Sequence, residues 1–340
     1  MRVRALLPVA LLLVMPGALP AQPAYINLTV NDVGIAIGDA PRVTGLRINF
    51  RDRHLERVNG VNITVWTPYE ATGDVNGIAI GVPATGARRI TGLGIGAGVA
   101  AEDRLRGITV AGVGAGAGQE LSGLVIAGLG GGTGGRFTGI GIAGLGFGAG
   151  RELRGAILAG LGAGTGGKLT GLTIAGLGAG AGEGIDGVTI AGLGVGSGGR
   201  VRGISIAVLG VGAGGGVSGL SIAGIGVGAG GEVRGVSLAG VGVGAPKLSG
   251  IVVAGFGAGT VDFNGGVIAP FYFRIERGGS MRGVSVSAFN RFSGVQHGLT
   301  IGVLNLTEEL RGIQVGLINI ARRNPPGRRV LPIVNWGSRG

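Results

Sequence analysis

Cysteine is absent from the 340-residue sequence, and histidine occurs only at His54 and His297. The lack of cysteine excludes disulfide bonds, thiolate catalysis, cysteine-ligated metals and a lipid-modified N-terminal cysteine. Two histidines that lie far apart in the sequence do not supply the several ligands that a metal centre requires. We therefore expect no metal site.

Patterns typical of catalysis or cofactor binding are also lacking. Matches to G-x-G-x-x-G are uninformative in a glycine-rich array, because a dinucleotide site also needs a preceding strand, a following helix and an acidic residue further on. The segment from Gly162 to Lys168 approaches the phosphate-loop form GxxxxGK, but Leu169 stands where a serine or threonine should bind magnesium. No acid, base and nucleophile converge. We expect a non-enzymatic protein with no catalytic or cofactor-binding residues and no small-molecule cofactor.

Beyond the N-terminus, glycine interrupts every apolar run. Arg2 and Arg4 precede the apolar stretch 5–15, which is too short to span a membrane as a helix and is followed by helix-breaking and small residues. We assign residues 1–21 as a signal peptide and expect export to the outer membrane or cell surface of a Gram-negative-type bacterium.

The formal net charge of +12 then favours outer-membrane lipid or an anionic cell-surface polymer as the partner, and not nucleic acid.

Glycine is what the sequence has in abundance, with 82 residues, and 45% of the chain is hydrophobic. The aliphatic residues distinguish it from disordered low-complexity chains, which are poor in them. A sixteen-residue unit opens with glycine at Gly107 and recurs up to Gly235, and related copies at spacings of fourteen to seventeen occupy much of the remaining chain. We predict a single repeat-built domain over 22–340, with a regular array over about 107–250.

The repeats favour β-structure, because their glycines disfavour helix and their Ile, Val and Leu residues alternate with regularly spaced turns. In the array, charged residues occur only in the four residues before each repeat glycine, as at Glu232 and Arg234 before Gly235. An uncharged stretch followed by a charged turn is typical of a strand that crosses a membrane. Our first prediction is an all-β antiparallel barrel of outer-membrane type with roughly 18 to 20 strands, about one per 14–17-residue repeat.

The order of apolar residues within a repeat favours a different fold. Val236 and Leu238 share one strand face, whereas Val241 and Val243 have the opposite parity. A bend near Ala239 would restore one apolar face. Two short strands per repeat would then form one coil of a β-solenoid or one hairpin of a shallow ring, and both remain alternatives to the barrel.

Two clusters stand out toward the C-terminus. Aromatic residues gather between 263 and 292, where either an interfacial girdle or local core packing would account for them. Basic residues without acidic neighbours follow Arg311. We expect Arg322, Arg323, Arg328 and Arg329 to form a rim that contacts anionic lipid headgroups.

The segments 298–306 (GLTIGVLNL), 312–321 (GIQVGLINIA) and 322–336 resemble the uncharacterised bacterial surface-repeat proteins of spirochaete, Bacteroidetes and Gemmatimonadetes type. That family has repeats of the form G-aliphatic-Gln-aliphatic-Gly-Leu-aliphatic-Asn-aliphatic. The resemblance implies a cell-surface or outer-membrane location and implies no reaction. The chain ends in glycine at Gly340, whereas outer-membrane barrels typically end in an aromatic residue.

Two functions therefore stay open. The first is a structural protein or weakly selective pore of the outer membrane. The second is an exported β-solenoid that acts in surface adhesion or as a matrix component. The sequence leaves the oligomeric state undetermined.

Overall fold

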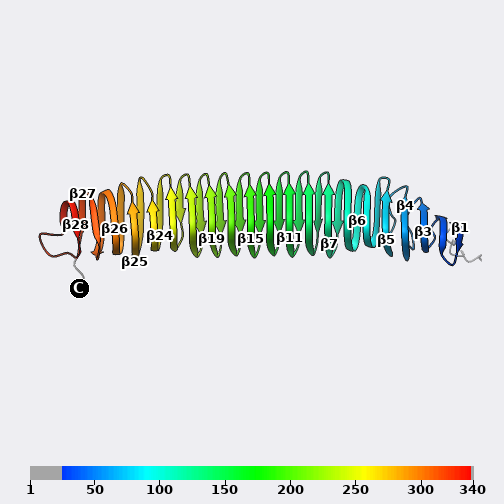
Figure 1. Ribbon diagram of the computed structural model, residues 1–340, viewed down its shortest axis with the longest axis horizontal. Helices are drawn as coiled ribbons and strands as arrows, with labels where there is room; N and C mark the ends of the chain where they lie inside the picture. The colour runs from blue at the N-terminus through cyan, green and yellow to red at the C-terminus, as the bar shows by residue number, and fades with distance from the viewer. Residues whose placement is uncertain (1–24, 338–340) are drawn as a thin grey trace, which may run out of the picture.

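The computed structural model describes residues 25–337, and this part of the chain is an all-β solenoid of about 18 turns. Its coils stack into a straight rod with the N-terminal end coloured blue and the C-terminal end red (Figure 1). At the usual strand separation of roughly 4.8 Å, about 18 turns give a rod about 85 Å long. The predicted signal peptide, 1–21, lies outside the described residues.

One coil consists of a long strand, a tight turn, a short strand and a second tight turn. In a representative coil the long strand is β11 (Glu152–Ala159) and the short strand is β12 (Gly162–Thr165). β11 pairs in parallel with β9 before it and β13 after it, so that Gly155 lies between Gly139 and Gly171. Each repeat thus contacts the repeats sixteen residues away, in constant register.

The barrel prediction is wrong, and the solenoid alternative is confirmed. A barrel of the predicted type needs antiparallel neighbours, whereas neighbouring coils of the array pair in parallel. The physical reason is the turn at Gly160 and Leu161, which divides the uncharged stretch of the repeat. That stretch therefore folds back on the coil as two strands and does not run on as one membrane-crossing strand.

The two strand types form two parallel sheets. The long strands of the array are β7 (Glu120–Ala127), β9 (Arg136–Ala143), β11, β13 (Lys168–Ala175), β15 (Gly184–Ala191), β17 (Arg200–Ala207), β19 (Gly216–Ala223), β21 (Glu232–Ala239) and β23 (Lys247–Ala254). The short strands are β8 (Gly130–Thr133), β10 (Gly146–Ala149), β12, β14 (Gly178–Ala181), β16 (Gly194–Ser197), β18 (Gly210–Ala213), β20 (Gly226–Ala229) and β22 (Gly242–Gly244).

Less regular coils flank the array at both ends. The preceding strands are β1 (Tyr25–Val30), β2 (Val33–Gly38), β3 (Arg42–Asn49), β4 (Arg57–Thr64), β5 (Asp74–Gly81) and β6 (Ala84–Ala117). The following strands are β24 (Gly257–Ile268), β25 (Tyr272–Val286), β26 (Phe289–Leu310), β27 (Ile313–Ala321) and β28 (Val330–Trp336). The described rod closes with an antiparallel pair at each end, β1 with β2 and β27 with β28.

The core lies between the two sheets and is narrow. In the coil of β11, the inward side chains are Leu153, Ile157 and Ala159, and Ala163 faces them from β12; all are at most 5% exposed. Small side chains at most of these places let the sheets approach closely. The interior of the described rod is therefore a packed core.

The predicted bend exists, because a turn at Gly240 separates β21 from β22. Our expectation that the bend restores a single apolar face is wrong. Val243 is buried, Val241 is exposed, and Val236 and Leu238 are half-buried on the outer side of β21 while Ser237 points inward. The aliphatic residues of each repeat are thus shared between the core and the surface.

Candidate interaction surface

The outward side chains of each coil are sorted by chemistry along the long strand. β11 begins with the outward residues Glu152 and Arg154, ends with the outward Leu158, and is followed by Leu161 in the turn. Because the coils stack in register, the same order recurs along the rod. The long strands of the array all point the same way (Figure 1), so one long edge of the rod is charged and the opposite edge is aliphatic.

We define the aliphatic edge as the turn residues between long and short strands together with the outward residues in the second half of each long strand. The turn residues form an uninterrupted ladder of large apolar side chains, each 43 to 57% exposed. Its members are Val113, Leu129, Leu145, Leu161, Leu177, Leu193, Leu209, Ile225, Val241, Phe256 and Phe271. On the long strands, Leu158 and Leu172 are exposed beside this ladder. A soluble rod would carry polar side chains here, so a continuous apolar surface indicates an interaction site.

At the turns of the aliphatic edge within the array, the backbone N–H groups are paired with carbonyls of the preceding coil. The Leu161 N–H donates to the Leu145 carbonyl at 2.7 Å, and the Gly160 N–H donates to the Ala143 carbonyl at 3.0 Å. The Gly162 N–H also donates to the Leu145 carbonyl, at 3.1 Å. The same bonds recur from coil to coil along the array. Apolar side chains and paired N–H groups both lower the cost of moving a protein surface out of water.

The charged edge comprises the turns before the long strands and the outward residues of their first half. Carboxylates and basic groups from neighbouring coils pair along it: Arg89 with Asp74 at 2.6 Å, and Arg106 with Glu120 at 2.8 Å. The hydrogen bond from Arg89 holds the pKa of Asp74 below its ordinary value, against the opposing effect of burial. The hydrogen bond from Arg106 likewise lowers the pKa of Glu120. Opposite charges on adjacent coils therefore favour the observed register.

Basic residues outnumber their partners on this edge. Within the described residues, four of them near the middle of the rod have no carboxylate within ion-pair distance: Arg151, Lys168, Arg200 and Arg234. These groups give the charged edge an excess of positive charge, in keeping with the formal net charge of +12 of the sequence.

The outer face of the short strands carries almost no side chains. Its outward residues are glycines, and a Cβ placed on Gly196 or Gly212 would meet nothing within 4 Å. This glycine face is flat and uncharged, and it continues from the aliphatic edge around the rod. It has no group that could recognise a ligand through its side chains.

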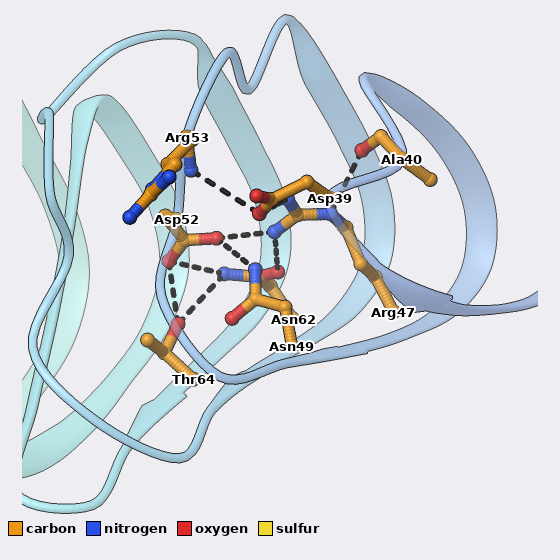
Figure 2. Close-up of polar contacts among 8 residues, drawn as sticks. All are labelled: Asp39, Ala40, Arg47, Asn49, Asp52, Arg53, Asn62 and Thr64. Carbon is orange, nitrogen blue, oxygen red and sulfur yellow. Dashed lines mark hydrogen bonds and ion pairs between the residues drawn. The ribbon is translucent and has the colours of Figure 1, made fainter. Parts of the chain in front are cut away.

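The N-terminal coils contain a buried polar cluster (Figure 2). Asp52 accepts hydrogen bonds from Arg47 and Asn49 of β3 and from Thr64 of β4, the last at 2.5 Å. Arg47 also donates to the Ala40 carbonyl at 2.8 Å. Arg47, Asp52 and Thr64 have no exposed surface. Solvent does not reach these groups, and most of their polar atoms are hydrogen-bonded to one another. The cluster is therefore a buried structural network and not a ligand site.

A second polar core closes the opposite end. Asn290 donates to Asn305 at 2.8 Å, Asn305 donates to Asn319 at 2.7 Å, and Gln314 donates to Gln296 at 2.9 Å. These side chains occupy inward places that hold aliphatic or small residues in the array. Polar core residues thus mark both ends of the described rod.

The four arginines predicted to contact lipid lie in and around the loop before β28. Arg322 pairs with Glu308 at 2.9 Å, and Arg323 pairs with Glu309 at 3.2 Å. Arg328 lies over the ring of Trp336, and Arg329 donates to the Asn324 carbonyl. Two of the four arginines are thus paired with carboxylates of β26, which the absence of acidic residues after Arg311 did not predict, and the contact with lipid stays a prediction.

The other residues that the sequence singled out are structural in their surroundings. His297 stands between Arg282 and Arg311 in the ladder on the charged edge, where burial and then these two cations lower its pKa. Lys168 is exposed on the same edge, where it is the first residue of β13 and not part of the preceding turn. Among residues 25–337, no group of three His, Cys, Asp or Glu side chains could hold a metal ion. The same residues include no helix of the length and apolarity needed to cross a membrane.

The aromatic residues between 263 and 292 include a buried group that packs in the core. Phe263, Phe273 and Phe292 are buried and pack edge to face, with ring centroids 5.2 and 5.4 Å apart. Phe256 and Phe271 instead stack on the aliphatic edge at 5.1 Å.

Sequence reasoning missed the aliphatic edge as a surface of a solenoid. The signal was the large apolar residue that comes two positions after the last residue of each long strand of the array, usually after a glycine.

Comparison of the chain with protein-family models, with curated proteins and with solved structures finds no match. The fold and its two chemically distinct edges are therefore the basis for any statement about function.

Proposed function

We propose that the protein is an exported, non-enzymatic β-solenoid that serves as a structural or adhesive element of the cell surface, with the aliphatic edge as its attachment side. The uninterrupted ladder of exposed aliphatic residues over the length of the array carries this proposal. A surface so extended and so uniform suits attachment, since it offers no local pocket for a small substrate. The predicted signal peptide and the resemblance to surface-repeat proteins support export.

The solenoid fold does not support the prediction of a pore. A pore needs a closed barrel with an open lumen, whereas the space between the two sheets is filled by side chains such as Leu153 and Ile157. The inward serines and threonines that would have lined a lumen, among them Thr173, are instead buried in the core.

The unpaired basic residues of the charged edge favour a second candidate function, binding of an anionic cell-surface polymer. Lys168 and Arg200 lie two coils apart and both are exposed, so a linear polyanion could follow them along the rod. Under this second function the protein would bridge two layers of the surface, attached by one edge and binding polymer by the other.

Fractionation of a diderm bacterial host that expresses the full chain tests the proposed function. We expect the chain in the cell-envelope fraction, and a variant with Leu161→Asp, Leu177→Asp and Leu193→Asp in the soluble fraction. The matched control replaces Thr138, Thr170 and Ser218, which lie outward near the charged edge, with aspartate and should remain in the envelope. Recovery of both the wild-type chain and the control in the soluble fraction would refute attachment through the aliphatic edge.

A further inference from the structure

The shape of the aliphatic edge limits what can cover it. Apolar side chains lie on two sides of a convex edge, with Leu158 and Leu172 on the long-strand face and Leu161 and Leu177 at the turn. The uncharged glycine face adjoins them. A second rigid rod could cover only one side of such an edge. A fluid phase of hydrocarbon chains can surround it.

The depth of the uncharged zone matches one layer of a bilayer. The zone begins at the first outward aliphatic residue of a long strand, such as Leu172, and ends at the turn. At about 3.3 Å per residue this gives a depth of about 10 to 15 Å. The hydrocarbon of one leaflet is about 15 Å deep, half of the full core. Over this depth the turns have no unpaired N–H group, as the bonds of Gly160, Leu161 and Gly162 illustrate.

The basic residues lie where lipid phosphates would be. Arg202 is two residues before Ile204, and Arg234 is two residues before Val236, on the same outer face. With the aliphatic edge immersed, these guanidinium groups would reach the headgroup level. The formal net charge of +12, or +10 without Arg2 and Arg4 of the predicted signal peptide (12 − 2 = 10), attracts anionic lipid and makes two copies of the chain repel each other. Charge therefore favours a lipid surface over a second copy as the occupant.

We propose that the aliphatic edge inserts into one leaflet of an anionic phospholipid bilayer, so that the rod lies along the membrane with its basic residues at the headgroup phosphates. This proposal rests on the attachment function proposed above and specifies the partner. The rod would not span the bilayer. It would be a β-structured counterpart of an amphipathic helix that lies in the interface.

Flotation of the purified chain with vesicles of pure lipid tests the proposal. The vesicles consist either of phosphatidylcholine alone or of phosphatidylcholine mixed with phosphatidylglycerol. We expect the chain to float with both and to bind the anionic vesicles more tightly. The variant with Leu161→Asn, Leu177→Asn and Leu193→Asn should bind at least about tenfold more weakly, because three apolar anchors are replaced by polar groups. The control with Thr138→Asn, Thr170→Asn and Ser218→Asn should bind like the wild-type chain.

A depth measurement keeps the proposal testable if the leucine variant fails to fold. Because the chain has no cysteine, Leu177→Cys and Thr170→Cys each allow a single fluorescent label on adjacent parts of one coil. On vesicles, the label at 177 should be shielded from an aqueous quencher and quenched by lipid-attached groups, and the label at 170 should stay accessible to water. Equal accessibility of the two labels would overturn insertion and would indicate adsorption by charge alone.

Other outcomes separate this proposal from the function on which it rests. The chain could stay in the cell envelope through the aliphatic edge and yet not bind pure lipid vesicles. Its partner would then be a protein or polymer, and only the lipid proposal would fail. If the chain forms a stable dimer that the three Leu→Asn changes dissociate, and this dimer does not bind vesicles, the occupant is a second copy and the lipid proposal is again overturned.

Discussion

The repeat glycine is the residue on which close stacking of the coils depends. Gly171 has a φ of +114°, and a Cβ placed there would lie 2.2 Å from the carbonyl oxygen of Gly155 in the preceding coil. The same approach recurs at every repeat glycine of the array. The spacing of these glycines was visible in the sequence. Its reason was not, because the neighbour that excludes a side chain is sixteen residues away and becomes a neighbour only in the folded coil.

Gly171→Ala should therefore destabilise the rod strongly. The left-handed backbone and the contact with a backbone carbonyl each oppose a side chain, and together we expect a loss of about 3 kcal/mol or more in the free energy of unfolding. The matched control is Gly196→Ala on the glycine face, where a Cβ meets nothing within 4 Å. The control should change stability by less than about 1 kcal/mol. Denaturant unfolding measures both, and equal effects of the two changes would contradict this account.

Buried threonines form a second residue-scale feature. Thr109, Thr173 and Thr189 point into the core, and their hydroxyl oxygens have no hydrogen-bond partner. Equivalent places in other coils hold Val125 and Val252, which are equally buried. The fold thus accepts an aliphatic side chain of the same shape at this place.

Thr173→Val should stabilise the protein. The change removes a buried, unpaired hydroxyl, whose desolvation costs about 1 to 3 kcal/mol, and leaves the shape of the side chain nearly unaltered. We expect a gain of about 1 kcal/mol in the free energy of unfolding. Thr170→Val, on the outer face of the same strand, serves as the control and should have little effect. A loss of stability in Thr173→Val would mean that the hydroxyl makes a bond in solution, for example to water.

At the scale of the strand, the local pattern of residues indicated both the long strand and the bend that follows it. The alternation of Leu172, Thr173 and Ile174 indicated a strand, and in β13 Thr173 points inward while Leu172 and Ile174 point outward. The change of parity near Ala239 indicated the bend, but not the exposed side chain in it, such as Leu177, because a large apolar residue in an exposed turn contradicts the usual composition of turns. The same contradiction is what makes the aliphatic edge a functional candidate.

The confinement of charge to one part of the repeat was also read correctly. Those residues form a ladder of ion pairs across coils, which no analysis of a single repeat could show. Asp74 lies deepest among the carboxylates of this ladder, with its side chain 11% exposed, between Arg88 at 3.2 Å and Arg89 at 2.6 Å. Since its folded-state pKa lies below the ordinary value of 3.8, its ionised form stabilises the folded rod.

Asp74→Asn should lower stability at neutral pH by about 1.5 kcal/mol, because hydrogen bonds to a charged group are replaced by weaker ones. A lowered folded-state pKa means that the contribution of Asp74 is fully present above its unfolded-state pKa and is lost as the pH falls through the folded-state pKa. The difference between the two proteins should therefore shrink below about pH 4. Thermal unfolding from pH 7 to pH 2 measures it. Asp186→Asn, at an exposed carboxylate 3.9 Å from Arg202, should show only a small difference at any pH.

At the scale of the whole molecule, stability comes from contacts between neighbouring coils. Each coil of the array touches only the coil before it and the coil after it, in parallel register. Polar side chains replace the apolar core near both ends of the described rod, with Asp52 near one end and Asn319 near the other. Because each coil contacts only its neighbours, the number of coils is not fixed by closure of a ring. The number of strands in a barrel is fixed in that way. A sequence repeat alone cannot distinguish these two ways of arranging strands, which is why the barrel and the solenoid were both open until pairing was known.

Removal of one whole coil tests this quasi-linear architecture. Deletion of residues 168–183 would bring β11 next to β15, with Gly155 opposite Gly187 and the basic Arg154 opposite the acidic Asp186. We expect a folded rod shortened by about 4.8 Å, with its β-type circular dichroism retained and its vesicle binding nearly unchanged. Deletion of residues 168–175 alone would remove a long strand without its short strand, shift every later coil out of register and leave the chain aggregated. Small-angle scattering and denaturant unfolding compare the two. If both deletions unfold the protein alike, the coils are not independent stacking units. The aliphatic edge would then depend on every repeat and could not be shortened by one coil.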